Sequence, residues 1–209
     1  MLDRRTVTLG LTAAAVGARA AAAGALPVTP QEMMGPFYPT HPLPDRDFDL
    51  TRVRGHASRA RGEIVEILGR VLRTDGTPVR NAAIEVWQAN ADGRYRHPDD
   101  VNPAPLDPDF QGYARLVSGG DGGFRLLTIK PGAYPAPIGL RAPHVHFDIR
   151  SDECRLVTEI YFPGEPLNLK DPLLSTMPAR HQDPALVVAH DENGSGGVRR
   201  IRWDAILLS

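Results

Sequence analysis

The sequence predicts an all-β fold, a β-sandwich with an irregular N-terminal arm and long loops. Short runs rich in β-branched and aromatic residues follow one another from residue 63 onward. Asp-Gly or Gly-rich turns separate many of these runs. Glycine and proline number 20 each, which is typical of many turns between short strands. About seven strands at this spacing indicate a sandwich of two sheets.

The expected strands can be placed in order along the chain. They cover residues 63–72, 82–90, 113–118, 124–132, 144–150, 156–162 and 199–208. The segment 191–199 is expected to form a hairpin tip. The longest helix candidate, residues 171–183, is weak because a proline splits it.

The N-terminal residues 1–25 are predicted to be a twin-arginine export signal. Arg4 and Arg5 precede a weakly apolar segment of alanine and glycine. Arg19 interrupts this segment and leaves too few apolar residues to span a bilayer. We therefore expect an exported protein, periplasmic or extracellular, with no membrane span in its mature form.

The next segment, residues 26–62, is predicted to be an ordered arm that wraps on the sandwich domain of residues 63–209. Prolines are dense in the arm and no periodicity persists. Phe37, Tyr38 and Phe48 supply apolar anchors of a kind that a flexible linker usually lacks.

Charge and cysteine content exclude several classes of protein. The formal net charge is −1, so nothing indicates binding to nucleic acid or electrostatic docking on a membrane. Cys154 is the only cysteine, which excludes an intrachain disulfide and a cysteine-rich zinc site. Any metal must therefore be held by histidine, tyrosine or carboxylate side chains.

The expected strand 144–150 carries an unusual polar face. His144, His146, Asp148 and Arg150 alternate with apolar residues, so they share one side of the pleat. The apolar side is expected to face the core. Asp148 and Arg150 are interpreted as solvated charges, whereas two imidazoles on one face need another reason.

Two tyrosines supply the complementary chemistry. Tyr95 follows a turn that ends a strand, and Tyr134 lies between two prolines that restrict its loop. Phenolate is a hard anionic donor that suits a highly charged cation better than Zn(II) or Cu(I). Two tyrosinates would offset two of the three charges on Fe(III), although spacing alone leaves open that both are ordinary sandwich tyrosines.

Several motifs in order resemble one enzyme family. The segments IEVWQANADGRYRH, LDPDFQGYARLVSGGDGGFRLLTIKPGAYP, RAPHVHFDI and LVTEIYFPGEP look like the core of the intradiol ring-cleavage dioxygenases. The arm segment TPQEMMGPFYP resembles the protocatechuate 3,4-dioxygenase branch. The resemblance runs from about residue 29 to 170 and implies a catalytic β-sandwich that holds one non-haem Fe(III).

The resemblance also implies roles for single residues. The iron ligands would be Tyr95, Tyr134, His144 and His146. Tyr134 would leave the iron when a catechol binds and would help to deprotonate it, and Arg141 would face the substrate and stabilise negative charge on its ring. The enzyme would cleave a catechol with O2 between the two hydroxylated carbons and give a cis,cis-muconate-type product. A homo-oligomer or a related partner chain is expected in this family.

The chain departs from the family pattern near the substrate. Glu159 stands where the family commonly has glutamine, and a carboxylate there disfavours an anionic substrate unless it is protonated or paired. Met33 and Phe37 replace a threonine and a tyrosine, while Gly35 and Pro36 are kept. Gly35, Pro36 and Glu159 are therefore candidate substrate-binding residues, and a less polar or larger catechol than protocatechuate is expected.

Two alternatives remain open from the sequence. A cupin-like site could use His144, His146 and Glu153, but it would leave both tyrosines without a role. The second alternative is a secreted, non-catalytic β-sandwich module of the carboxypeptidase regulatory-like or transthyretin-like kind. The segment GRVLRTDGTPVRNAAIEVW resembles such modules.

Other aromatic and histidine positions receive simpler interpretations. Trp87 is predicted to be a core residue. His56, His97, His181 and His190 are predicted to be surface residues, although His97 is the nearest rival to the ligand set because it is close to Tyr95 in sequence.

Overall fold

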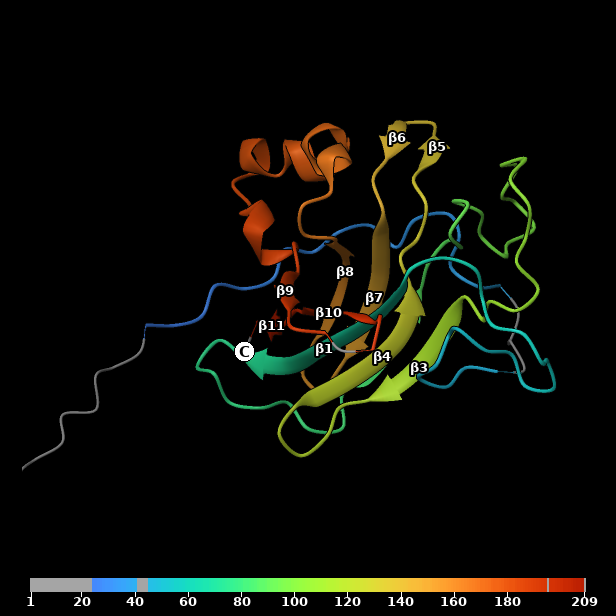
Figure 1. Ribbon diagram of the computed structural model, residues 1–209. Coiled ribbons are helices and arrows are strands. Elements are labelled where there is room, and N and C mark those ends of the chain that lie inside the picture. The colour runs from blue at the N-terminus through green and yellow to red at the C-terminus, as the bar shows by residue number, and fades with distance from the viewer. Residues whose placement is uncertain (1–23, 41–44, 195, 209) are drawn as a thin grey trace, which may run out of the picture.

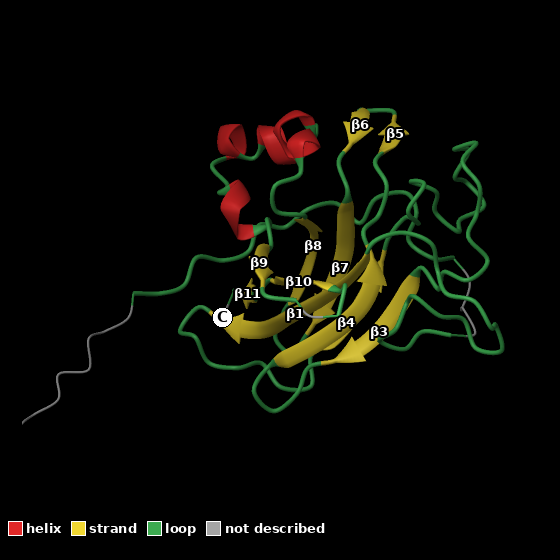
Figure 2. Ribbon diagram, viewed as in Figure 1, coloured by secondary structure: helices red, strands yellow, loops and turns green. Residues whose placement is uncertain are grey.

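A computed structural model gives the structure of residues 24–40, 45–194 and 196–208. Residues 1–23 of the predicted export signal lie outside the described residues. The described chain is built mainly of strands in two layers, with short helical turns at one end (Figures 1 and 2). Within these ranges, every helix falls short of the length and apolar character that a membrane span requires.

One layer is a five-stranded sheet centred on β1. This strand pairs antiparallel with β4 on one side and parallel with β10 and β11 on the other. Strand β9 continues the sheet beyond β10 as its antiparallel partner, so the two strands form a hairpin at the expected place, although the expected tip 191–199 includes the ends of both strands. The bounds are β1 Ile64–Arg73, β4 Gly123–Ile129, β9 His190–Glu192, β10 Arg199–Arg202 and β11 Ala205–Leu207.

The other layer is a four-stranded antiparallel sheet in the order β3-β2-β7-β8. Its bounds are β2 Ala83–Trp87, β3 Tyr113–Val117, β7 His144–Arg150 and β8 Arg155–Tyr161. The inner faces of the two sheets meet in a closed apolar core, to which Ile67 and Leu126 contribute from the first sheet and Ile84 and Phe147 from the second. The alternation in β7 therefore puts its apolar side in the core, as expected.

The predicted sandwich is confirmed, and three strands escaped prediction. Strands β5 (Tyr134–Ala136) and β6 (Gly139–Arg141) form a separate hairpin, and β9 is equally short. Three-residue strands carry too little periodicity to be recognised, and prolines obscure the β5–β6 hairpin further. The expected strand 199–208 is divided into β10 and β11 by residues 203–204.

The helix candidate at 171–183 is wrong as one element. Four short 3-10 turns occupy the segment after β8 instead. Proline at the start of several turns supplies the fixed backbone angle but cannot continue a hydrogen-bonded helix. Their bounds are η1 Pro166–Lys170, η2 Leu174–Thr176, η3 Pro178–Arg180 and η4 Pro184–Leu186.

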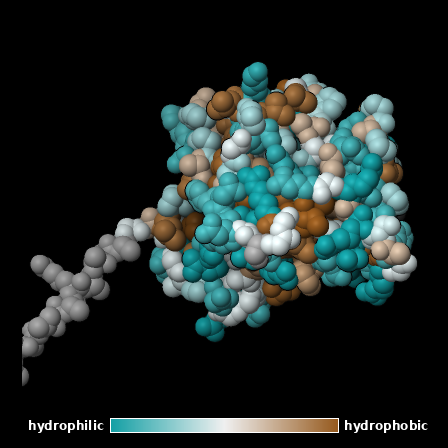
Figure 3. Space-filling model, in the orientation of Figure 1, coloured by the Kyte–Doolittle hydropathy of each residue, from teal (hydrophilic) through white to brown (hydrophobic). Residues whose placement is uncertain are grey.

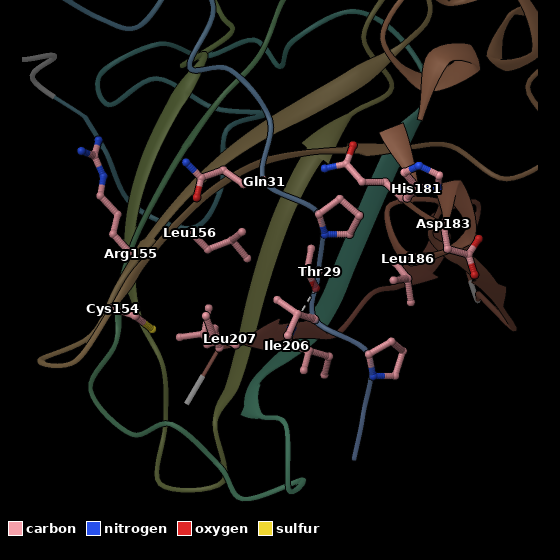
Figure 4. A pocket seen from close by; sticks show the side chains of 15 residues that line it. Thr29, Gln31, Cys154, Arg155, Leu156, His181, Asp183, Leu186, Ile206 and Leu207 are labelled. Carbon is pink, nitrogen blue, oxygen red and sulfur yellow. Dashed lines mark hydrogen bonds between the residues drawn. The ribbon is translucent and has the colours of Figure 1, made fainter. Parts of the chain in front are cut away.

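The N-terminal arm bridges the edges of the two sheets. The backbone N–H of Thr29 donates to Ile206 in β11 at 3.0 Å, and the Ile206 N–H donates back to the Thr29 hydroxyl at 2.9 Å. Three residues later, the Glu32 N–H donates to Val157 in β8 at 2.8 Å. Figure 4 shows this junction, where a cavity of about 600 Å³ lies between the arm and the two edge strands. The arm thus occupies strand edges that would otherwise be unpaired.

Farther along, the arm covers the outer face of the β3-β2-β7-β8 sheet. The Tyr38 hydroxyl donates to the Glu85 carboxylate of β2 at 2.7 Å, and the Tyr113 hydroxyl of β3 donates to it at 2.8 Å. This cover makes the outer face of the sheet a second buried region, separate from the apolar core.

Candidate metal centre

Polar and aromatic side chains line up across the outer face of the β3-β2-β7-β8 sheet. Trp87, His146 and Glu159 occupy paired positions on three adjacent strands, and His144 pairs with Tyr161. Residues paired in this way have their Cβ atoms about 5 Å apart and point the same way. The strand register therefore brings both imidazoles and Glu159 to one end of a covered sheet face.

Two loops bring the phenols to the same place. The Tyr95 hydroxyl lies 3.1 Å from His146 Nε2 and 3.5 Å from His144 Nε2. The Tyr134 hydroxyl lies 3.4 Å from His144 Nε2. The structure thus gathers all four residues that the sequence nominated as metal ligands, and their donor atoms face one another.

The position of each phenol is fixed by its backbone. The Tyr95 N–H donates to the Asp100 carboxylate at 2.7 Å, which anchors the turn after β2. Tyr134 opens β5 and pairs with Arg141 at the end of β6. Gly93 has φ +78°, and a Cβ there would lie 2.4 Å from the Ala133 carbonyl, so only glycine lets the two tyrosine loops approach this closely.

The surroundings of each imidazole determine which nitrogen faces the phenols. His144 Nδ1 lies 2.6 Å from the Ala142 carbonyl oxygen, which holds the proton on Nδ1 and leaves Nε2 free. The His146 ring stacks flat on Trp87, with ring centroids 4.8 Å apart. Its Nε2 faces Tyr95, and its Nδ1 lies 3.4 Å from Glu159 Oε1. Both Nε2 atoms are therefore presented to the same point.

Burial shifts the pKa of every donor in this cluster toward its neutral form. It lowers the pKa of His146 to about 3 and also lowers that of His144. It raises the pKa of Tyr134 to about 12 and that of Tyr95 well above its usual value. Neutral imidazoles are ready metal ligands, but the phenols would ionise only beside a strongly charged cation.

The donor set fits Fe(III) better than a site built on the neighbouring carboxylate. His144, His146 and Glu159 do place possible ligand atoms within 4.8 Å of one another. However, Glu159 faces the Nδ1 edge of His146, away from the Nε2 atom that meets the phenols. Two hard phenol oxygens and two imidazole nitrogens match a hard, highly charged ion.

Arg141 lies in a network of buried hydrogen bonds beside the donor cluster. Its guanidinium donates to Asp171 Oδ2 at 2.9 Å, to the Tyr161 hydroxyl at 3.0 Å and to Glu159 Oε2. The Tyr161 hydroxyl donates to Glu159 at 2.8 Å. Burial would raise the pKa of the Glu159 carboxyl, but the charge of Arg141 and its hydrogen bond to this carboxylate outweigh burial and hold the pKa well below its usual range. The carboxylate that replaces the expected glutamine is thus ionised and paired.

A cavity of about 500 Å³ opens next to the donor cluster. Tyr134, Arg141 and Glu159 line it, so it connects directly with the phenol and the guanidinium. Gly35 and Pro36 of the arm also line it. The predicted substrate-binding residues therefore lie together around one opening. The larger cavity in Figure 4 is lined by none of the four candidate ligands.

The arm approaches the donor cluster closely at Gly35. This residue has φ +70°, and a Cβ there would lie 3.3 Å from His146 Cε1. Two residues later, the Phe37 ring packs on Tyr95 with centroids 4.8 Å apart. Both the backbone angle and the close contact favour glycine at position 35.

Several sequence interpretations need correction. Glu153 of the cupin-like alternative is exposed and binds Arg73 at 2.7 Å, so it lies outside the cluster. His97 is buried against Phe37 instead of being a surface residue. Asp148 is fully buried and accepts hydrogen bonds from Arg155 at 2.9 and 2.8 Å, so it is not a solvated charge.

Other interpretations agree with the structure. His56, His181 and His190 are exposed, as predicted, and Arg150 is also exposed. Trp87 is buried, as predicted for a core residue, although its neighbours are the site aromatics and not the inter-sheet core.

Sequence reasoning missed two residues of the Arg141 network. Tyr161 lies two positions after Glu159 in β8, so strand alternation alone could have placed both on one face. Asp171 gave no such signal because it lies in the irregular segment between η1 and η2. Its carboxylate accepts from the Ala142 N–H at 2.8 Å as well as from Arg141.

Comparisons with known proteins support an enzyme over a non-catalytic module. A family model described as "Dioxygenase" matches residues 33–209. The chain is 44% identical to the protocatechuate 3,4-dioxygenase beta chain of Burkholderia cepacia, over 73% of this chain and 67% of that one. It is 36% identical to a hydroxyquinol 1,2-dioxygenase of Rhizobium sp., over 51% of this chain and 40% of the relative.

A solved structure shares the fold over most of this chain. It is the dioxygenase domain of a dioxygenase–carbohydrate-binding protein fusion from Streptomyces sp. SirexAA-E, with a TM-score of 0.63 and 27% identity. The match covers 87% of this chain and 98% of that domain.

Proposed function

The chain belongs to the intradiol ring-cleavage dioxygenase family, and we propose that it cleaves a catechol with O2 between the two hydroxylated carbons. The product would be a cis,cis-muconate-type diacid. One observation carries this proposal: two phenols and two imidazoles converge with donor atoms 3.1 to 3.5 Å apart, and one of the phenols, Tyr134, also lines the adjacent cavity. The non-catalytic β-sandwich module offers no reason for such a cluster.

We propose that Tyr95, Tyr134, His144 and His146 hold a non-haem Fe(III) ion. When bound, this ion would supply Lewis-acid chemistry, drawing electron density from a catecholate and orienting it. The hydrogen bond from His144 Nδ1 to the Ala142 carbonyl keeps the ring in the tautomer that can ligate. The flat stack of His146 on Trp87 fixes the direction of its Nε2 atom.

Tyr134 is suited to moving a proton. It belongs to the donor cluster and also lines the cavity, so its hydroxyl oxygen can meet an incoming catechol hydroxyl. Burial raises the pKa of this phenol to about 12, so a tyrosinate released in the cavity readily takes up a proton. Tyr134 would therefore accept the proton that the catechol must lose, at Oη.

Arg141 would stabilise negative charge that develops on the substrate. Its guanidinium lines the cavity and is held by Asp171, Glu159 and the Tyr161 hydroxyl. A cation that is already fixed in a buried site needs little reorganisation when charge appears, which is the usual source of such stabilisation.

The experiment is cleavage of unsubstituted catechol by the Fe(III)-loaded protein under ¹⁸O₂. Intradiol cleavage consumes one O2 per catechol and places both oxygen atoms in the muconate. We expect this stoichiometry and both labels in the product. Lack of O2 consumption, or a ring opened outside the two hydroxylated carbons, would contradict the proposal.

We further propose that the protein is exported and works outside the cytoplasm. The support is the paired Arg4 and Arg5 ahead of an alanine- and glycine-rich segment. Replacing both arginines by lysine should retain the protein in the cytoplasm of a bacterial host, as measured by cell fractionation. Unchanged export of the double variant would contradict twin-arginine transport.

We also propose that the chain assembles with itself or with a related chain. The support is that relatives are named as beta and alpha chains of protocatechuate 3,4-dioxygenase. Light scattering of the purified protein should give a mass that is a multiple of the mature chain. A monomer at micromolar concentration would leave only the related-chain alternative, which co-expression would test.

A further inference from the structure

The cavity beside the donor cluster is much larger than a bare catechol ring requires. Its volume is about 500 Å³, whereas a cavity of about 150 Å³ already holds benzene. Tyr134 and Arg141 line one part of it, so a ring placed for the proposed chemistry would leave most of the space unfilled. The remaining space must accommodate a substituent or water.

The walls of that remaining space are apolar. Met33 comes from the arm, Val101 from the loop after β2, Ile138 from the β5–β6 hairpin and Leu173 from the segment before η2. Met33, Val101 and Ile138 are more than 45% exposed, so these apolar side chains are not buried in the core. Figure 3 shows apolar side chains gathered over this hairpin and the nearby 3-10 turns. Solvent-exposed apolar walls around a reactive site are typical of ligand recognition.

The charges of the lining disfavour a carboxylate on the ring. Arg141 is the one cation among the described lining residues, against the acids Asp99, Asp100 and Glu159. Its guanidinium already donates to Glu159 and to Asp171. Arg141 is assigned to the charge that develops on the ring, so a substrate carboxylate would find no second cation among the described lining residues and would lie near acidic groups, which is unfavourable.

From these observations we infer that the preferred substrate is a catechol with an uncharged, apolar ring substituent, and not a dihydroxybenzoate. This inference rests on the proposed function, because it assumes that the catechol ring lies at Tyr134 and Arg141. The alkyl or aryl group would lie among Met33, Val101 and Ile138. The closely related chain named for protocatechuate would then differ from this one in its substrate pocket.

The first test is anaerobic binding to the Fe(III)-loaded protein, measured by calorimetry. The ligands are catechol, 4-methylcatechol, 4-propylcatechol, 4-pentylcatechol and 3,4-dihydroxybenzoate. Each buried methylene should lower Kd about fourfold until the cavity is filled. The dihydroxybenzoate should bind about 100-fold more weakly than 4-propylcatechol. Equal or tighter binding of the carboxylate, or no dependence on chain length, would overturn the inference.

A matched pair of variants tests whether the ring substituent lies in this cavity. Ile138 and Leu140 lie in the same hairpin and are 49% and 50% exposed, but only Ile138 lines the cavity. Ile138→Lys should tighten dihydroxybenzoate binding about tenfold or more and weaken 4-pentylcatechol binding. Leu140→Lys adds the same charge outside the cavity and should change neither Kd by more than twofold. Equal effects of the two variants would contradict the placement of the ring substituent beside Ile138.

Catechol cleavage separates this inference from the proposed function. If catechol is cleaved but the alkyl series shows no preference, the inference alone fails. If no catechol binds or is cleaved, the proposed function fails and the inference falls with it.

Discussion

The two ends of one strand face carry buried polar residues with different organisation. At one end of β7, His144 and His146 meet Tyr95 and Tyr134 as four neutral donors that face one another. Two residues farther along the same face, Asp148 is equally buried.

The Asp148 end of the strand is closed. Both carboxylate oxygens of Asp148 accept from Arg155, and Arg150 donates to the same group. The positive and negative charges are thus satisfied within the protein, and the cluster lines no part of the 500 Å³ cavity. Burial alone therefore does not distinguish the two ends of the strand. The difference is that four neutral donor groups face one another beside a cavity at one end, whereas paired charges occupy the other.

The largest effect should come from removing a donor. His146→Ala removes an imidazole nitrogen that faces Tyr95. Loss of an outer partner of a metal ligand typically lowers metal affinity about 10- to 100-fold, so loss of the ligand itself should lower it more. We expect iron content well below one per chain after dialysis, and loss of ring cleavage. The measurement is metal analysis alongside O2 uptake.

Arg155→Ala is the matched control for that variant. It disrupts the closed cluster on the neighbouring strand, so iron content should stay at the wild-type level. Iron loss in both variants would show that general destabilisation explains the result.

The next effect concerns the fixed cation. Arg141→Lys keeps the charge but loses the planar fork that reaches Asp171 and Glu159 together. We expect kcat/KM for catechol to fall about 100-fold, in the range for loss of a preorganised charge-stabilising donor. Iron content should change little, because Arg141 is outside the donor set. A wild-type value of kcat/KM for this variant would contradict the role of Arg141 in stabilising charge on the substrate.

Breaking the closed cluster should affect stability instead of chemistry. Asp148→Asn removes the charge that pairs with Arg150 and Arg155. The arginine side chains are 45% and 49% exposed, so water can partly replace the lost partner. We expect the free energy of unfolding to fall by about 1 to 3 kcal/mol, with kcat/KM for catechol unchanged. Denaturant titration and steady-state kinetics together check both parts.

The ionised Asp148 carboxylate also predicts that the free energy of unfolding depends on pH. Burial would raise the pKa of Asp148, but its hydrogen bonds with Arg155 and Arg150 outweigh burial and lower it below the unfolded value of about 3.9. The stabilisation that the ionised Asp148 carboxylate contributes is therefore fully present above about pH 4. It is lost as the pH falls through the lower pKa that Asp148 has in the folded protein. The stability difference between wild type and Asp148→Asn should shrink below pH 4. A difference that grows on acidification would contradict this assignment.

The smallest effect should follow loss of one exposed partner. Arg150→Ala leaves Arg155 bound to both oxygens of Asp148. We expect a loss below about 1 kcal/mol in unfolding free energy, as for a partly exposed ion pair. A loss of unfolding free energy as large as that of Asp148→Asn would show that Arg150, and not Arg155, is the main stabilising partner of Asp148.

Sequence patterns predicted what depends on local periodicity. Alternation placed His144 and His146 opposite the core residues of β7, and the four candidate ligands do converge. The state of Asp148 could not be predicted in this way. Asp148 is paired with Arg155 of the adjacent strand β8, and the alignment of these two strands cannot be read from the sequence of β7 alone.

Long-range packing also explains the other errors. Glu159 could be recognised as a departure from the family pattern, but its pairing with Arg141 and Tyr161 required the β6, β7 and β8 geometry. The burial of His97 follows from its contact with Phe37 of the arm. Three-residue strands such as β5 depend on their partner more than on their own sequence.

The most direct test of the metal centre is the visible absorption of the protein titrated with Fe(III). Charge transfer from tyrosinate to Fe(III) should give a broad visible band that saturates at one iron per chain. Tyr95→Phe and Tyr134→Phe should each weaken the band strongly. Tyr113→Phe removes another buried phenol of the same sheet face and should leave the band intact. A colourless wild-type protein, or equal loss in all three variants, would contradict iron ligation by Tyr95 and Tyr134.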